Sequence, residues 1–256
     1  MTHKKDGTLR IMTYNLLVHY RSWGGRPVRQ RAQGVISLIK EIHPDVLCLQ
    51  EVDYPWTNVL SKVPHYHFTE SLKNGLLLHM TTLLYNSETM KLLKSGSIAY
   101  KHGHLKTNRR ICYGIFKIKA TGGKVCVIST HLSLVFRNDP RYLRTMSLQV
   151  RQLDETVTRL CQTYHCPVII GGDFNCKEPY LNAPVSDATV IYNQLAQCFK
   201  DAKTKTHTRS RDHIFLRGPV CVDHYEHMRS KTLTALSDHN PLMIDCHIVK
   251  KEAHHD

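Results

Sequence analysis

The chain has 256 residues, 41% of them apolar, which is enough to bury the core of one α/β domain without disulfides. No stretch approaches the roughly 18 uncharged apolar residues of a membrane span, and the first residues lack the apolar segment of a signal peptide, so a secreted or membrane-spanning protein is not expected. Lys and Arg outnumber Asp and Glu by 35 to 21, and the net charge of +14 favours polyanionic partners, nucleic acid or an anionic membrane surface.

Short apolar runs of β-type composition alternate with helical stretches along the chain. In chain order, strands are predicted at 9–17, 45–52, 81–87, 111–119, 124–132, 167–175, 212–218, 220–228 and 241–249. Helices are predicted over Val28–Ile42, Asp139–Tyr164 and Ala188–Lys200, and a hairpin turn at the glycine pair 122–123. No linker or repeat interrupts this order. A single domain is therefore expected over 9–249, with short tails at 1–8 and 250–256.

Strands that are apolar on both faces and interleaved with helices favour an α/β layer architecture. Polar residues recur at or beside the ends of these strands: Asn15, Glu51, His131, Asp173, Asn175, Asp212, Asp238 and His239. Strand-end loops are where a rigid scaffold brings together side chains from distant positions in the sequence. This recurrence predicts a functional site.

Carboxylates are costly beside buried strands unless they are paired or bind a cation. Glu51, Asp173 and Asp238 all raise this problem, and carboxylates converging with amide oxygens favour a hard cation, Mg²⁺ or Mn²⁺. For any one acid alone, a cap or turn is the simpler interpretation; Asp173 after two glycines fits an Asx-turn. In the functional interpretation, Gly171 and Gly172 let the backbone approach substrate closely.

Two histidines occupy similar strand-end positions. His131 and His239 can act as an acid, a base or a donor to phosphate oxygen near neutral pH, although a lone histidine there is more often structural. Asp212 is a candidate to fix the tautomer of one of them.

Nine cysteines are scattered along the chain, and their odd number and wide spacing favour reduced thiols and an intracellular location, cytoplasmic or nuclear. Cys161 and Cys166 are separated by four residues, but no second pair follows, so a zinc site is not expected there. Close histidine pairs, at 65/67, 102/104 and 224/227, are interpreted as solvated surface residues.

Six motifs, in order, resemble the endonuclease/exonuclease/phosphatase superfamily: "TYN" (13–15), "QE" (50–51), "THL" (130–132), "GDFN" (172–175), "RDHIF" (211–215) and "SDH" (237–239). The resemblance spans 9–245. It implies a DNase I-like α/β fold, a four-layer sandwich of two mixed β-sheets packed face to face and flanked by helices, with the site at one end. It also implies a metal-dependent phosphoesterase.

The resemblance further implies a metal site. Glu51 is expected to be the principal Mg²⁺ ligand, with Mn²⁺ as a possible substitute. Asn15 is expected at the metal or its water shell, and Asp238 to complete the site. In-line hydrolysis of a phosphoester by an activated water is the reaction implied.

The same resemblance assigns catalytic roles. Asp173 is expected to orient or deprotonate the attacking water, and Asn175 to donate to a non-bridging phosphate oxygen. His239, held by Asp212, is expected across the scissile phosphate, and His131 at a phosphate-contacting or proton-transferring position.

Two positions leave alternatives open. Arg110 matches an arginine that meets phosphate in several branches of the family, but an exposed arginine at a strand entry is as often merely solvated. Ser210 stands where arginine is common in the family, and Arg211 directly precedes Asp212. A shift of one residue would turn the Asp212 side chain to the other face of its strand.

Three functions compete for this constellation. A monomeric nuclease or phosphodiesterase acting on DNA or RNA is favoured by the charge and by the basic stretch 203–211, which could also be a solvated loop. A sphingomyelinase-like or inositol-phosphate phosphohydrolase is the alternative within the superfamily, although the expected membrane anchor and ring-phosphate signatures are not evident. A non-enzymatic basic binding module is disfavoured because every core polar position is present. The sequence separates neither DNA from RNA nor endo- from exonucleolytic cutting.

Overall fold

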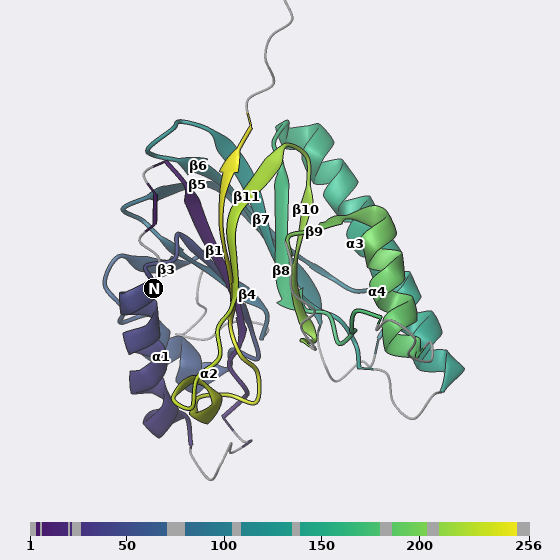
Figure 1. Ribbon diagram of the computed structural model, residues 1–256, viewed down its shortest axis with the longest axis horizontal. Coiled ribbons are helices and arrows are strands. Elements are labelled where there is room, and N and C mark those ends of the chain that lie inside the picture. Colours follow the sequence, from purple (N-terminus) through teal and green to yellow (C-terminus); the bar gives the residue numbers. More distant parts are fainter. Residues whose placement is uncertain are drawn as a thin grey trace, which may run out of the picture.

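Two six-stranded sheets pack face to face, with helices on both outer faces (Figure 1). The computed structural model describes residues 4–5, 7–19, 21, 27–70, 80–103, 109–134, 139–179, 186–203 and 210–249. Each sheet is mixed, with one parallel pair among antiparallel neighbours. The predicted fold class, a four-layer α/β sandwich, is confirmed.

The two sheets have similar strand patterns. The first has the order β11 (Val220–His227), β12 (Leu242–Ile248), β1 (Leu9–Asn15), β2 (Val46–Gln50), β4 (Thr82–Asn86) and β3 (Tyr66–Phe68). The second has the order β5 (Met90–Ala99), β6 (Arg110–Ile118), β7 (Lys124–His131), β8 (Val168–Asp173), β10 (Asp212–Arg217) and β9 (Lys200–Asp201). The parallel pairs, β1 with β2 and β7 with β8, lie near the middle of each sheet and therefore carry their strand ends to the same edge.

The helices divide between the sheets. α1 (Val28–Ile42) and α2 (Tyr54–Leu60) cover the first sheet, and α3 (Pro140–Tyr164) and α4 (Asp187–Cys198) cover the second, while the short 3₁₀ helix η1 (Leu233–Ala235) precedes β12 (Figure 1). Apolar side chains form three clusters, one under each helical layer and one between the sheets. Strands buried on both faces explain why the central runs are apolar without alternation.

All nine predicted strands and all three predicted helices are present, with ends within two residues of the prediction. The predicted hairpin turn is also found: Gly122 adopts a left-handed φ of 73°, and its N–H donates to Ile118 O over 2.8 Å. The sequence missed β3, β5, β9 and α2. The strand β5 was missed because it is an edge strand with mostly exposed or half-buried residues, and α2 because it is only 7 residues long and contains a proline.

The two glycines before Asp173 lie at places where the chain packs too closely for a side chain. A Cβ on Gly171 would lie 2.8 Å from Cys48 Sγ, across the interface between the sheets, and one on Gly172 would lie 2.3 Å from the backbone oxygen of Thr130 on the neighbouring strand. Both glycines therefore permit close packing of the sandwich. The prediction that they let the backbone approach substrate stays a prediction.

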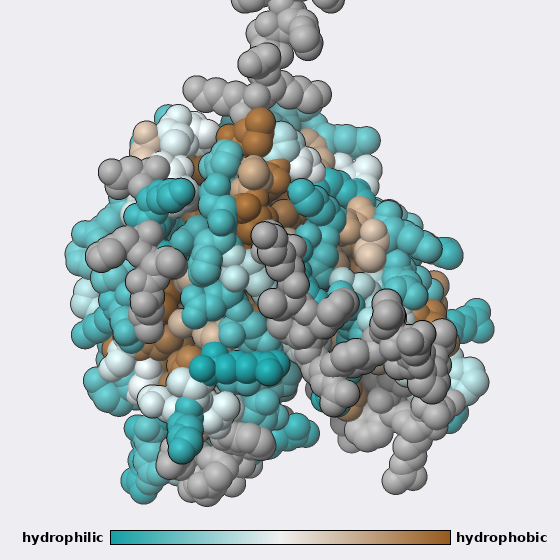
Figure 2. Space-filling view, viewed as in Figure 1, coloured by the Kyte–Doolittle hydropathy of each residue, from teal (hydrophilic) through white to brown (hydrophobic). Residues whose placement is uncertain are grey.

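The outer surface is mostly hydrophilic on the side seen in Figure 2, with apolar atoms gathered in its upper middle, near the ends of β11 and β12 in Figure 1. Val249, just after β12, is 45% exposed. Val222 and Ile248 are partly buried and pack against the cluster between the sheets. No helix among the described residues has the length and apolar character needed to cross a membrane.

Candidate active site

The strand ends of the two sheets meet at one edge of the sandwich. In the second sheet, His131 at the end of β7 and Asp212 at the start of β10 both pair in register with Asp173 at the end of β8. In the first sheet, Asn15 pairs with Gln50, and Glu51 follows directly. Backbone register alone therefore places three of the predicted side chains in one row and two in a facing row.

Asp173 lies at the centre of this arrangement and is almost fully buried. Its Oδ2 lies 3.1 Å from His131 Nε2 and 3.7 Å from His239 Nε2, and it accepts a hydrogen bond of 3.1 Å from Asn15 Nδ2. Its Oδ1 accepts from the backbone N–H of Asn175 over 3.0 Å. One carboxylate thus joins the two sheets and orients both histidines.

His239 is held from the opposite side by Asp212. His239 Nδ1 lies 2.8 Å from Asp212 Oδ2, so the pairing predicted from the sequence is present and the Asp212 side chain points toward the site. The hydroxyl of Ser210 lies 3.3 Å from the same oxygen and accepts from the Asp212 N–H over 3.0 Å. The loop that carries His239 is fixed to β1, because Ser237 Oγ donates to the Asn15 carbonyl over 2.7 Å.

The charges of this cluster follow from its burial and its partners. Burial opposes ionisation of Asp173, but the attraction of His131 and His239 outweighs it and holds the pKa of Asp173 well below its usual range. Burial likewise lowers the pKa of His239, but Asp212, through charge and hydrogen bond, and then Asp173 raise it to about 10. Burial raises the pKa of Asp212, although the charge and hydrogen bond of His239 oppose this. At neutral pH, therefore, His239 carries its proton between the two carboxyl groups.

Glu51 has the surroundings of a cation ligand. Its Oε1 accepts from Asn15 Nδ2 over 3.3 Å and its Oε2 from the Val18 N–H over 3.1 Å, and among the described residues no Lys, Arg or His lies within ion-pair distance of it. Its backbone has a left-handed φ of 59°, which is uncommon for glutamate. A half-buried carboxylate beside ionised Asp173, without a cationic partner, fits an oxygen-preferring divalent cation.

The other acids are placed less favourably for that cation. Asp173, Asp212 and His239 lie within 4.8 Å of one another and form a geometric metal cluster, but charged His239 already supplies the positive charge between the two carboxylates. Asp238 is exposed and lies outside this cluster. Asn15 turns its amide N–H groups to the carboxylates and accepts from the Leu17 N–H with its oxygen, a geometry better suited to the water shell of a metal than to direct ligation.

An arginine that sequence reasoning missed lies at the site. Arg109 Nη1 donates to the Leu132 carbonyl over 2.6 Å, and Asn175 Nδ2 donates to the same oxygen over 2.9 Å. Burial lowers the pKa of Arg109, while Asp173 and Glu51 attract its charge. Arg110, the predicted phosphate ligand, instead directs its Nε to Ser97 Oγ on the neighbouring strand at 2.8 Å. Because successive side chains of an extended chain alternate in direction, the two arginines face different surroundings.

A second missed arginine supports the site from below. Arg31 is fully buried on α1 and donates to the carbonyls of Leu16, Leu17 and Leu236 over 2.6, 2.9 and 2.8 Å. Its guanidinium also lies 5.0 Å from the ring centroid of Trp56. It thereby ties the segment after β1 to the segment that leads into His239. A basic residue inside a helix gave no sequence signal for this role.

The basic stretch 203–211 falls mostly outside the described residues. Lys203, the first residue of this stretch, forms an ion pair with Glu178. Arg211, the last, is exposed and directly precedes Asp212. The remaining members, 204–209, lie outside the described part of the chain.

Sequence comparison finds one family for most of the chain. A model of the Endonuclease/Exonuclease/phosphatase family matches residues 12–239. Protein angel homolog 1 from Homo sapiens is 26% identical over 157 residues, covering 55% of this chain and 23% of that protein. Tyrosyl-DNA phosphodiesterase 2 from Gallus gallus is 22% identical (59% and 38% covered), and human Nocturnin 24% identical (66% and 43% covered). The match thus spans less than half the length of these relatives.

Solved structures agree on the fold. The human Nocturnin catalytic domain superposes with a TM-score of 0.73 at 20% identity, covering 96% of this chain and 97% of that one. A humanised D. rerio TDP2 gives 0.71 at 20% identity, covering 94% and 99%. A mannosyl-6-phosphatase from Bacteroides thetaiotaomicron gives 0.73 at 18% identity, covering 93% and 99%. These proteins share one fold but are named for different activities, so the fold alone does not identify a substrate.

Proposed function

Because this chain belongs to the Endonuclease/Exonuclease/phosphatase family, we propose that it is a metal-dependent phosphodiesterase that hydrolyses nucleic acid. One observation carries the proposal: Asp173 lies within 3.7 Å of two histidines and is joined through Asn15 to Glu51, whose carboxylate has no cationic partner in the described part of the chain. Such an arrangement presents positive and negative groups side by side, as in-line attack of water on a phosphate requires.

The proposed cation is Mg²⁺, with Mn²⁺ as a substitute, held by Glu51 with Asn15 at its water shell. When bound, it supplies neutralisation of phosphate charge and stabilisation of the leaving oxygen. We place Asp238 at the rim of this site, because its side chain is exposed and lies outside the cluster of Asp173, Asp212 and His239.

The side chains of this chain do the remaining work. Asp173, kept ionised by its histidines, orients or deprotonates the attacking water. Protonated His239, held by Asp212, donates to a phosphate oxygen as negative charge develops, and His131 contacts the phosphate from the other side of Asp173. Asn175 and Arg109 share the Leu132 carbonyl and are the proposed donors to the non-bridging oxygens.

Nucleic acid is the proposed substrate class for two reasons. The net charge of +14 raises the local concentration of polyanions, and a relative named for tyrosyl-DNA lies among the matches. Neither reason distinguishes DNA from RNA as the substrate, and neither indicates where the strand is cleaved.

The test is one purified preparation, with Mg²⁺ or with EDTA, against a substrate panel. It contains single- and double-stranded DNA, abasic DNA, RNA with and without a poly(A) tail, 5′-tyrosyl DNA, sphingomyelin, inositol phosphates and mannose 6-phosphate. Hydrolysis of a nucleic acid that stops in EDTA supports the proposal. Hydrolysis of sphingomyelin or a sugar phosphate alone would overturn the proposed substrate class. If no substrate is hydrolysed, the proposal that the protein is a phosphodiesterase is wrong.

Glu51→Gln provides the matched variant. It keeps the side-chain volume and removes the charge, so hydrolysis should fall by at least about 10³-fold while nucleic-acid binding persists. Glu88→Gln is the control, because Glu88 is exposed and lies 3.5 Å from His65, away from the strand ends of the site. Equal activity in both variants would remove Glu51 from the mechanism.

A further inference from the structure

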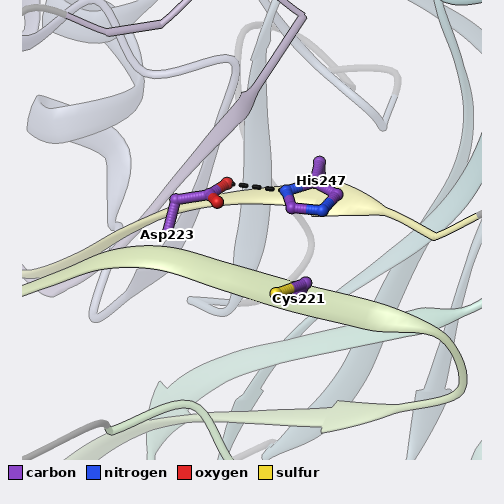
Figure 3. Close-up of side chains that lie close together, drawn as sticks. All are labelled: Cys221, Asp223 and His247. Carbon is purple, nitrogen blue, oxygen red and sulfur yellow. Dashed lines mark hydrogen bonds and ion pairs between the residues drawn. The ribbon is translucent and has the colours of Figure 1, made fainter.

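A second group of metal-ligating side chains lies on the outer face of the first sheet, on β11 and β12. Cys221 and Asp223 come from β11 and His247 from β12, and one ligand atom from each lies within 4.8 Å of the other two. Figure 3 shows the three side chains together, with Asp223 Oδ2 hydrogen-bonded to His247 Nδ1 at 2.8 Å. All three residues are exposed.

The local backbone explains this grouping. Cys221 and His247 are directly opposite each other in the antiparallel pairing of β11 and β12. The register shifts between Val222 and His224, so Asp223 is the extra residue of a β-bulge. Val222 packs against the cluster between the sheets, which leaves Cys221 and Asp223 on the solvent face beside the imidazole.

This group lies away from the candidate active site. Cys246, the neighbour of His247, pairs with Leu9 at the start of β1, whereas the active-site edge begins at Asn15 at the end of that strand. Six residues of extended strand correspond to about 20 Å. The two groups therefore occupy opposite ends of the same strands.

The donor set differs from that of the active site as well. A thiol sulfur, an imidazole nitrogen and a carboxylate oxygen together match the ligands of Zn²⁺, whereas Mg²⁺ takes oxygen ligands. Of the nine cysteines, all within the described residues, Cys221 alone is exposed. It is thus the thiol best placed to take an ion from solution.

We propose that Cys221, Asp223 and His247 bind one Zn²⁺ ion, with the fourth position open to water or to a ligand atom from another molecule. On binding, the thiol proton is released to solvent, the sulfur coordinates as thiolate, and the imidazole coordinates through a neutral nitrogen. The ion would join the edge strand β11 to β12 across the bulge. Sequence spacing did not reveal the site, because its ligands come from two strands 24 residues apart.

Zinc affinity of the full chain, freed of metal with a chelator, tests the proposal by competition with a chromophoric chelator. The wild type should bind one more Zn²⁺ per chain than Cys221→Ser. Asp223→Asn and His247→Ala should each weaken that ion by at least about tenfold, since even outer partners of a ligand are worth that much. The matched control is His65→Ala, which breaks an exposed histidine–carboxylate pair that has no cysteine in its cluster and should bind as the wild type does.

Cobalt provides a second measurement that does not depend on stability or activity. Co²⁺ in the wild type should give a thiolate-to-metal charge-transfer band in the near ultraviolet that is absent in Cys221→Ser. Equal zinc stoichiometry and affinity in wild type and Cys221→Ser, or a Co²⁺ complex without that band, would overturn the site. Hydrolysis with Mg²⁺ is expected to be the same in both proteins, so failure of the zinc site and failure of the proposed activity are separate results.

Discussion

Replacing Asp212 by Asn removes a charge from the cluster while keeping its shape and a hydrogen bond to His239. The pKa of His239 is about 10 in the structure, against 6.5 for an isolated imidazole, and Asp212 is the largest of the groups that raise it. A difference of about 3.5 pH units corresponds to roughly 5 kcal/mol in favour of the imidazolium. In Asp212→Asn we expect this pKa to fall by about 2, a usual effect of losing one close opposite charge.

The pKa of His239 is measured by NMR titration, with His239→Gln to assign its signal, and by the pH dependence of kcat/KM. The alkaline limb of the wild-type profile should lie near pH 10 and should move toward pH 8 in Asp212→Asn. Asp223→Asn, which removes the carboxylate partner of a remote histidine, should leave it unchanged. An alkaline limb below pH 8 in the wild type, or the same His239 titration in both proteins, would refute the electrostatic argument.

The raised pKa of His239 also makes the stability of the fold depend on pH. Because the folded pKa is raised above the unfolded value, protonated His239 stabilises the fold fully below about pH 6.5, and this contribution is lost as the pH rises to about 10. The difference in unfolding free energy between the wild type and His239→Gln should therefore decline across that interval. A constant or rising difference would contradict the raised pKa.

Three further substitutions test the parts around the cluster. Arg109→Met should lower kcat/KM by about 10² if the guanidinium faces phosphate, and more than Arg110→Met does. Arg31→Met should cost about 3 kcal/mol of unfolding free energy in urea, because the buried carbonyls of Leu16 and Leu236 lose the guanidinium donor and that of Leu17 keeps only the Trp56 indole, whereas exposed Arg29→Met should change it by less than about 0.5 kcal/mol. Gly171→Ala should cost about 1–3 kcal/mol by overpacking the sheet interface.

Periodicity was sufficient for most of the fold, because the central strands and long helices are each buried along a continuous face. α3 illustrates this: its apolar residues recur every three or four positions, and Asp139 caps its first turn by accepting from the Arg141 N–H. The strand β5 is different, since most of its residues are half-buried or exposed and its pattern does not separate it from a loop. Edge elements are defined by pairing with a neighbour, which sequence pattern does not contain.

The site was predictable where a residue ends a buried strand. Asp173, His131 and Asp212 form one row because strand register fixes them. Asp212 pairs with His239 although Ser210 and Arg211 depart from the pattern common in the family. Whether Arg109 or Arg110 faces the site depends on the direction of the backbone where β6 begins, and the sequence does not specify that direction. Arg31 could not be recognised at all, since its partners are backbone carbonyls.

Two side chains of the site occupy uncommon backbone conformations, and this bears on how the site forms. Glu51 and Asn175 have left-handed φ angles of 59° and 50°. Asparagine tolerates this region, but glutamate pays about 1–2 kcal/mol there. The conformation of Glu51 persists because the Val18 N–H and Asn15 hold its carboxylate, and Asn15 in turn donates to Asp173 on the opposite sheet. Glu51 is therefore held within the first sheet, and Asn15 couples it to Asp173 on the second sheet, so loosening the sandwich should impair cation binding before it unfolds the strands.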